Sequence, residues 1–327
     1  MYRILLALCM IVGALNAQEI RPTKITVAQD GSGDYKTIQE AINSCRDLGQ
    51  TLVTIHVRNG LYKEKLVIPS EKTAIKLVGE DRDNTVITYD DYSGKVIPPG
   101  MEIPGKDKYS TFTSYTLLIQ GSDITLENLT IQNTAGPVGQ AVALHLEGDR
   151  IVVRNCKILS HQDTLLVTKD GSRQYFVDCF IEGTTDFIFG EATALFVNCT
   201  INSLKNSFVT AASTRENTRF GFVFVKCKLI ANEGITEVYL GRPWRPFAKT
   251  VFIECELGRH IRAEGWDPWK GDKMFPDKDK TAYYAEYKNF GEGSTVSRRV
   301  AWSKQLTKKE AREYTIKNIF GSWNPVQ

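Results

Sequence analysis

The sequence lacks an excess of charge of either sign. It has 41 Lys and Arg residues and 38 Asp and Glu residues, which gives a net charge of +3 over 327 residues. The basic residues are scattered apart from the pair Lys308-Lys309, whereas nucleic-acid-binding proteins gather theirs into patches. With only 11 prolines and 42% hydrophobic residues, the composition excludes collagen-like, low-complexity and disordered chains. We therefore expect a globular protein with a sizeable core and no nucleic-acid partner.

Long hydrophobic runs are also scarce. The one apolar run, residues 4–15, follows Arg3 and is succeeded by a small residue, Ala17. About a dozen apolar residues behind a basic start are typical of a secretory signal, whereas crossing a bilayer takes about 20. We predict a signal peptide over 1–17 and a single domain over 18–327. That domain is expected to be exported, periplasmic or extracellular, to be a monomer and to have no membrane partner.

Clusters of metal ligands are missing too. The sequence has no CxxC pair, and its four histidines are far apart, so we expect no metal and no cofactor. Beyond the predicted signal, which contains Cys9, six cysteines remain: Cys45, Cys156, Cys179, Cys199, Cys227 and Cys255. An even number of cysteines in an exported protein is typical of disulfides. A sequence repeat explains the spacing of five of them without a covalent constraint, so we favour buried thiols and keep bridges as the alternative.

The repeat is a phrase of alternating apolar and polar residues around a cysteine. Its copies are 152–158 (VVRNCKI), 176–181 (FVDCFI), 196–201 (FVNCTI), 224–229 (FVKCKL) and 252–257 (FIECEL), with an earlier copy at 124–131 (ITLENLTI) in which Leu129 replaces the cysteine. Successive cysteines are 23, 20, 28 and 28 residues apart. A period in the twenties made of short alternating segments indicates a solenoid, and alternation places the cysteine and the aliphatic residue two positions later on the inner face.

These features predict an all-β parallel β-helix with capped ends. A β-sandwich is disfavoured, because its turn signals come every 8–12 residues. Thr37 and Glu40 form a capping box that opens an N-terminal helix, expected to run through Leu48 and to close one end of the solenoid. Thr307 with Glu310 opens a second helix near the C-terminus. The segment 92–110, rich in Pro, Gly and Lys, is expected to be a long excursion that helps to shape a binding groove.

Two carboxylates stand at the same phase of neighbouring coils. Asp163 and Asp186 are 23 residues apart, the same step as from Cys156 to Cys179. Because stacked strands lie about 4.8 Å apart, the two aspartates should be neighbours on one outer face. Two carboxyl groups this close repel each other when both are ionised, so their pKa values differ: one is protonated and acts as an acid while the other stays ionised. The alternative is that each aspartate only forms a turn.

Further polar groups share this phase. Gln140 and Gln162 are 22 residues apart, and their amides could stabilise a developing negative charge in the same groove, although an amide ladder or a solvated face would also explain them. Arg242 and Trp244 stand in a turn with Gly241 and Pro243. Arginine can hold a carboxylate by two parallel hydrogen bonds and an indole can stack on a sugar ring, while simple surface packing is the alternative.

Together these residues carry a resemblance to the pectinesterases, the pectin methylesterase family of carbohydrate esterases. The phrases that match, in the order and spacing of the family, are 27–34 (VAQDGSGD), 60–64 (GLYKE), 140–144 (QAVAL), 162–165 (QDTL), 186–190 (DFIFG), 240–244 (LGRPW) and 265–266 (GW). The resemblance implies a right-handed parallel β-helix that hydrolyses methyl esters of galacturonosyl units in pectin, releasing methanol and leaving pectate. Methyl-esterified pectin is the partner so implied.

The resemblance also implies a role for each matching residue. Asp186 corresponds to the nucleophile of the family and Asp163 to its general acid and base. Gln140 and Gln162 correspond to the oxyanion-hole amides, and Arg242 to the residue that holds the nucleophile ionised and oriented.

Substrate contacts follow in the same way. Trp244 corresponds to the sugar platform, Thr111 resembles a substrate-contacting threonine, and Gln140 and Arg242 also face the substrate. The sequence departs from the plant pattern at Leu166, where Tyr is frequent, and at Ala212, where Gln is common. These departures bear on subsite preference rather than on the chemistry.

Two other functions remain open at this stage. A β-helix pectate lyase or polygalacturonase would break the glycosidic bond instead, and a lyase typically needs a calcium site built from several carboxylates. A non-catalytic glycan-binding solenoid would use Trp244 without needing the paired aspartates. The products distinguish them: methanol for the esterase, and new chain ends for the lyase or polygalacturonase.

Overall fold

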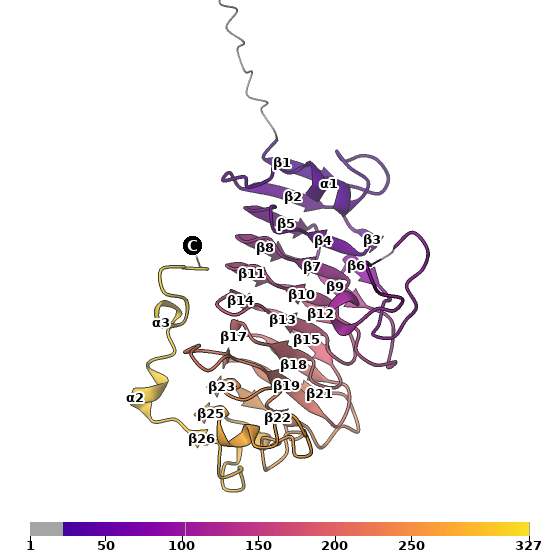
Figure 1. Ribbon diagram of the computed structural model, residues 1–327. Helices are drawn as coiled ribbons and strands as arrows, with labels where there is room; N and C mark the ends of the chain where they lie inside the picture. The colour runs from indigo at the N-terminus through magenta and orange to yellow at the C-terminus, as the bar shows by residue number, and fades with distance from the viewer. Residues whose placement is uncertain (1–21, 102, 327) are drawn as a thin grey trace, which may run out of the picture.

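The computed structural model describes residues 22–101 and 103–326, so the predicted signal peptide over 1–17 lies outside the described residues. The described residues form 26 short strands that pair in parallel and wind into a stack of coils, from β1 at one end to β26 at the other (Figure 1). Most coils contribute one strand to each of three sheets. The prediction of an all-β parallel solenoid is confirmed.

The first sheet has eleven strands. In order along the stack they are β1 (Lys24–Val27), β2 (Val53–Val57), β5 (Ile75–Gly79), β8 (Ile124–Glu127), β11 (Ile151–Arg154), β14 (Arg173–Val177), β17 (Thr193–Val197), β20 (Phe222–Val225), β23 (Lys249–Ile253), β25 (Tyr283–Tyr287) and β26 (Lys304–Gln305).

The other two sheets have seven and eight strands. The seven-stranded sheet contains β4 (Leu66–Ile68), β7 (Leu117–Ile119), β10 (Leu144–Leu146), β13 (Leu165–Val167), β16 (Ile188–Gly190), β19 (Phe208–Ala212) and β22 (Tyr239–Gly241). The eight-stranded sheet contains β3 (Gly60–Lys63), β6 (Thr85–Tyr89), β9 (Thr130–Asn133), β12 (Lys157–Leu159), β15 (Phe180–Gly183), β18 (Thr200–Ser203), β21 (Lys228–Ala231) and β24 (Glu256–Leu257).

A single left-handed residue turns the chain from the eleven-stranded to the eight-stranded sheet. It is the polar residue that precedes each cysteine of the repeat, with φ of 47° at Asn155, 55° at Asp178 and 54° at Asn198. Asn and Asp adopt this conformation more readily than most residues because their short polar side chains bond locally. The side-chain Nδ2 of Asn155 donates to Oδ1 of Asn128 one coil away, at 2.8 Å. The repeat therefore encodes the corner as well as the strands.

The interior is filled by stacks of like side chains. All six cysteines of the described residues are buried and unbridged, so the expectation of buried thiols is confirmed. Beside them the rings of four phenylalanines stack at centroid distances of 4.5, 4.4 and 4.3 Å: Phe176, Phe196, Phe224 and Phe252. In the earlier copy of the repeat, Leu129 is fully buried as well. Each coil thus adds apolar area to one continuous core.

The N-terminal end is closed by α1 (Ile38–Ser44). Its capping box is present as predicted, with Thr37 accepting from the Glu40 amide and Glu40 from that of Thr37. The helix ends at Ser44 rather than at Leu48, because Cys45 is extended and Leu48 has a φ of 51°. The buried face of α1 packs over the first coils, as a solenoid end requires.

The C-terminal tail returns along the eleven-stranded sheet (Figure 1). It contains α2 (Lys308–Ala311), which Thr307 and Glu310 cap as predicted, and α3 (Ile316–Phe320). Phe320 is buried in an apolar cluster with strand residues such as Tyr175, and its carbonyl accepts from Arg173 Nη1 at 2.7 Å. The tail therefore covers the apolar outer face of the sheet.

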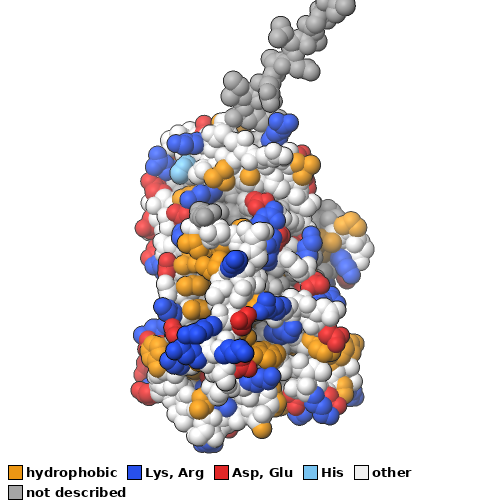
Figure 2. All heavy atoms as spheres, turned by 90° about the vertical axis from the view of Figure 1, so that its left-hand side faces the viewer, with side chains coloured by type: hydrophobic (Ala, Val, Ile, Leu, Met, Phe, Trp, Pro, Cys, Tyr) orange, Lys and Arg blue, Asp and Glu red, His pale blue; other side chains and the backbone are white. Residues whose placement is uncertain are grey.

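Acidic and basic side chains are interspersed on the surface that Figure 2 shows.

Three 3-10 turns complete the described elements: η1 (Thr111–Thr113), η2 (Lys278–Lys280) and η3 (Glu292–Ser294). The described residues of the excursion predicted at 92–110 leave the stack after β6 and project from it before η1 (Figure 1). Within the described residues, no helix has the length and apolar character needed to cross a membrane.

Candidate active site

The structure brings Asp163 and Asp186 to the same edge of the seven-stranded sheet. Each lies two residues before a strand, and those strands pair with Leu165 opposite Ile188. The Asp163 amide donates to the carbonyl of Thr185 at 3.1 Å, which ties the two turns together. Both aspartates have left-handed backbones, with φ of 65° and 49°. The matched spacing in the sequence therefore becomes a matched position on adjacent coils, about 4.8 Å apart along the stack.

Burial gives these carboxyl groups unusual proton affinities. Asp163 is 8% exposed and Asp186 is 7% exposed. Loss of solvent, and then the nearby charge of Asp186, raise the pKa of Asp163 to about 8. Burial also raises the pKa of Asp186, but hydrogen bonds from Arg242 act in the opposite direction. At neutral pH, Asp163 is therefore protonated, while the two hydrogen bonds from Arg242 favour the carboxylate form of Asp186.

Arg242 fixes Asp186 by a bidentate contact. Its Nε donates to Oδ1 at 2.9 Å and its Nη2 donates to Oδ2 at 2.7 Å. The guanidinium carbon lies 3.9 Å from the ring centre of Phe208 and 3.6 Å from that of Trp269. Two parallel hydrogen bonds and two aromatic rings leave the guanidinium little freedom. The arrangement presents an oriented, ionised carboxylate.

The two glutamines lie beside the aspartates. Gln140 and Gln162 form an isolated parallel bridge, and the amide of Ala141 donates to the Gln162 carbonyl at 3.0 Å. Both side chains are half-buried, and that of Gln162 acts to lower the pKa of the Asp163 carboxyl group. The structure thus places Gln162 on the coil of Asp163 and Gln140 on the coil before it, so both predicted amides lie at the same end of the seven-stranded sheet as the carboxyl pair.

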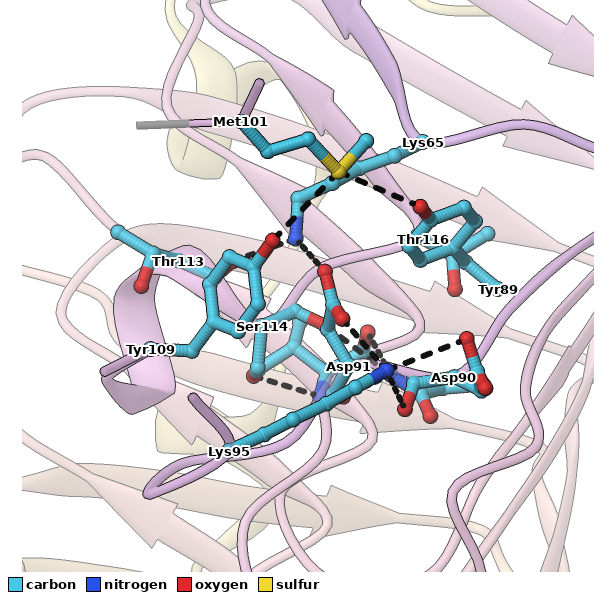
Figure 3. Close-up of polar contacts among 12 residues, drawn as sticks. Lys65, Tyr89, Asp90, Asp91, Lys95, Met101, Tyr109, Thr113, Ser114 and Thr116 are labelled. Carbon is cyan, nitrogen blue, oxygen red and sulfur yellow. Dashed lines mark hydrogen bonds and ion pairs between the residues drawn. The ribbon is translucent and has the colours of Figure 1, made fainter. Parts of the chain in front are cut away.

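A buried ion pair anchors the turn that carries Thr111. Lys65 Nζ lies 2.5 Å from Asp91 Oδ2 and donates to the carbonyl of Thr113 at 2.7 Å, while Lys95 Nζ lies 2.9 Å from Asp91 Oδ1 (Figure 3). The Lys65 amine also faces the ring of Tyr109, 4.3 Å from its centre.

The same cluster also bonds to the backbone of Gln140. The Ser93 amide, two residues after Asp91, donates to the carbonyl of Gln140 at 2.9 Å. Asn133 Nδ2 donates to the carbonyls of Asp91 at 2.8 Å and Ser114 at 3.0 Å. The start of the excursion is therefore bonded both to η1 and to the backbone of Gln140.

A cleft of about 500 Å³ opens beyond the carboxyl ends of the strands that follow the aspartates. Its lining includes Phe112, Thr168, Glu191, Trp244, Arg245 and Phe275. Trp244 lies across from Phe189, with ring centres 5.9 Å apart. Thr111 itself is half-buried and does not line this cleft, whereas its neighbour Phe112 is half exposed into it.

The two positions that depart from the plant pattern are both inside the protein. Leu166 is fully buried in an apolar cluster that packs against Tyr115, Trp244 and Trp269. Ala212 is fully buried in the main core. Leu166 therefore supports the aromatic side chains of the site from beneath rather than lining the cleft.

Sequence reasoning missed the aromatic residues that enclose Arg242. Phe208 opens β19 one coil after Asp186, and the phase of the repeat could have indicated it. Trp269 comes three residues after the 265–266 phrase, in a loop that has no repeat phase, so spacing gave no signal for it.

Comparison with known proteins gives one consistent result. The family model described as Pectinesterase matches residues 24–322. Putative pectinesterase 11 of Arabidopsis thaliana is 39% identical over 91% of this chain and 79% of its own length. Probable pectinesterase/pectinesterase inhibitor 23 of the same plant is 37% identical over 88% of this chain. The chain spans about half the length of that relative and of several others.

Solved structures agree. The pectin methylesterase from carrot has a TM-score of 0.81 and 34% identity, covering 92% of this chain and 95% of its own. The pectin methylesterase PemA from Erwinia chrysanthemi has a TM-score of 0.79 and 31% identity, covering 92% and 97%. A pectin methylesterase in complex with a hexasaccharide has a TM-score of 0.80 and 32% identity over the same shares. These likenesses confirm the right-handed parallel β-helix.

Proposed function

The chain belongs to the pectinesterase family, and on that premise we propose that it hydrolyses the methyl esters of galacturonosyl units in pectin, releasing methanol and leaving pectate. One observation carries the mechanism: a carboxylate held ionised by a bidentate arginine stands next to a carboxyl group whose pKa is about 8. An aspartyl esterase needs this division between a nucleophile and a proton donor.

In the first half-reaction, Asp186 attacks the ester carbonyl carbon through one carboxylate oxygen. The carbonyl oxygen takes up the negative charge, and the side-chain amides of Gln140 and Gln162 donate hydrogen bonds to it. Asp163 gives its proton to the methoxide as the ester C–O bond breaks, so that methanol leaves. The product on the enzyme is an anhydride between Asp186 and the galacturonate carboxyl group.

In the second half-reaction, water hydrolyses that anhydride. Asp163, now ionised, takes a proton from the water as its oxygen attacks the galacturonoyl carbonyl carbon. The anhydride bond breaks, Asp186 leaves as a carboxylate, and free galacturonate is formed. The proton returned to Asp163 restores the starting state, while the newly formed acid ionises in solution.

Trp244, Thr111, Arg242 and Gln140 form the proposed substrate contacts. Trp244 lines the cleft with an indole face that suits a sugar ring. Arg242 and Gln140 do not line it and would meet the ester through their places beside Asp186 and Gln162. For Thr111 the support is indirect, because its neighbour Phe112 lines the cleft. We further propose that residues 1–17 direct export, that 18–327 act as a monomeric domain, and that no cofactor takes part.

Incubation of the purified protein with highly methylated pectin and, separately, with unesterified pectate tests this function. We expect methanol from the first substrate, none from the second, and no shortening of either chain. Chain shortening without methanol would instead identify a lyase or polygalacturonase, and binding without turnover would identify a glycan-binding solenoid.

The nucleophile is tested by Asp186→Asn, for which we expect a loss on the order of 10⁴-fold or more in kcat. Asp178→Asn is the matched control, because Asp178 is exposed and also has a left-handed backbone, with φ of 55°. Its activity should stay near that of the wild type. Methanol release by Asp186→Asn at the wild-type rate would refute the assignment.

A further inference from the structure

A fully buried lysine lies next to the active site and takes no part in the proposed mechanism. Lys278 opens η2 in the loop that follows Trp266, and none of its side chain is exposed. Its Nζ lies 2.7 Å from Asp272 Oδ2 and donates to the carbonyl of Trp244 at 3.5 Å. Burying a lysine is costly unless the charge is paired, so its presence here calls for a physical reason.

Lys278 also contacts the indole that covers Arg242. Its Nζ lies 4.1 Å from the ring centre of Trp269, and the guanidinium carbon of Arg242 lies 3.6 Å from the same ring. The backbone amide of Trp269 donates to Asp267 Oδ1 at 2.7 Å. One indole thus meets two cations, and a series of contacts runs from Asp272 through Lys278, Trp269 and Arg242 to Asp186.

The charges around Asp186 come from several elements. Arg242 follows β22 and bonds to it, Asp163 comes from the preceding coil, and Asp267 and Lys278 come from the loop after Trp266. The positive charge of Lys278 acts to lower the pKa of Asp186, and that of Asp267 acts to raise it. Lys278 in turn faces Asp272, Arg245 and Arg242.

We propose that Lys278 is a positioning residue for ester hydrolysis: paired with Asp272, it fixes Trp269 over Arg242 and, as a cation, extends to lower pH the range in which Asp186 is a carboxylate. The inference rests on the proposed function, because it assigns Lys278 a role through the nucleophile. A lysine that merely packed the loop would affect stability or the width of the cleft, and it would leave the ionisation of Asp186 unchanged.

The test is the pH dependence of kcat/KM in Lys278→Met, which keeps the length of the side chain and removes its charge. We expect the acidic limb to move to higher pH by a few tenths of a unit to about one unit. A cation in direct contact would change the pKa of a carboxyl group by more, but Lys278 is separated from Asp186 by an indole and a guanidinium group. On the plateau above the limb, kcat should fall by less than about threefold. Lys278→Arg should restore the wild-type limb.

Lys280→Met is the matched control. Lys280 stands two residues away on the same turn, pairs with Asp277 at 3.1 Å, and has 70% of its side chain exposed. Its acidic limb should not move. Asp272→Asn provides a second variant, because it removes the negative charge that offsets Lys278, and it should move the limb to lower pH, opposite to Lys278→Met.

A direct titration separates this inference from the proposed activity. In protein labelled with ¹³C at aspartate carboxyl carbons, the Asp186 signal is identified by its loss in Asp186→Asn and followed with pH in wild type and in Lys278→Met. A higher midpoint in Lys278→Met supports the role even where no methanol is released. The proposed role of Lys278 is overturned if the midpoint of the Asp186 titration is unchanged in folded Lys278→Met and Asp272→Asn. It is also overturned if Lys280→Met shifts that midpoint as much as Lys278→Met does.

Discussion

Arg242 donates two hydrogen bonds to Asp186, at 2.9 and 2.7 Å, and this contact divides the roles of two carboxyl groups that burial alone would make alike. Asp163 and Asp186 are equally shielded, at 8% and 7% exposure. Only Asp186 bonds to the guanidinium among the contacts of Arg242 on the described residues. In the proposed mechanism, the arginine therefore decides which carboxyl group is the nucleophile and which is the acid.

The pKa of Asp163 predicts an alkaline limit to activity. Asp163 must carry a proton when methoxide leaves, and burial raises its pKa to about 8. Activity should therefore fall as pH rises through about 8, and kcat/KM should follow a bell whose acidic limb belongs to Asp186. Initial rates of methanol release across pH 4–10, measured in buffers of constant ionic strength, test this. Activity that keeps rising above pH 9 would contradict the role of Asp163.

The same group predicts a change in stability. A carboxyl group whose pKa is higher in the folded state than the ordinary 3.8 binds its proton more tightly when folded. Its contribution to stability is therefore greatest at low pH and is lost as pH rises from about 4 to about 8. Asp163→Asn removes this titration, so the variant should melt at a higher temperature than the wild type at pH 8, with the difference shrinking toward pH 4. Thermal unfolding at pH 4 and at pH 8 measures this difference in melting temperature. A stability gain of Asp163→Asn over the wild type that is smaller at pH 8 than at pH 4 would contradict the prediction.

The oxyanion donors give a prediction of magnitude. Gln162 precedes Asp163 in the chain and stands on the coil next to Gln140, and the proposed mechanism assigns its amide to the anion that forms during attack. Removing one such donor costs on the order of 100- to 1,000-fold in kcat. We expect Gln162→Ala to fall in that range with KM for pectin nearly unchanged. Gln305→Ala, an exposed glutamine in β26, serves as the control and should retain full activity.

Buried and exposed ion pairs should differ in their effect on stability. Lys65→Met removes one partner of Asp91, which is 1% exposed and retains Lys95, so we expect a loss of about 2 kcal/mol in the free energy of unfolding. Arg58→Met breaks the exposed pair with Glu80 and should leave the free energy of unfolding almost unchanged. Urea unfolding measures both. Because the cluster bonds to the backbone of Gln140, Lys65→Met should also lower kcat, whereas Arg58→Met should not.

The repeat explains why much of the site could be predicted from the sequence. In a solenoid, residues separated by one full coil are neighbours in space. The step of 23 residues from Cys156 to Cys179 is one coil, and Asp163 and Asp186 are separated by the same step, so the sequence predicted that they are neighbours. Phase says nothing about loops between coils, which is why Trp269 and Lys278 were missed. The end of α1 was misplaced because the chain leaves the helix at Cys45, whose backbone is extended and whose side chain is buried, and the capping box marks only where a helix begins.

Trp244 provides a prediction about binding rather than chemistry. Its indole lines the cleft and packs beside Phe189, and it forms no contact with the carboxylate of Asp186 among the interactions of the described residues. Trp244→Ala should therefore raise KM for pectin about tenfold, the equivalent of about 1.4 kcal/mol, with a smaller change in kcat. Phe290→Ala, an exposed aromatic residue away from the cleft, is the control and should leave both constants unchanged. A fall in kcat without a change in KM would instead mean that Trp244 stabilises the transition state rather than the bound substrate. The side chain that stacks on the sugar would then be another one of the cleft, such as Phe112.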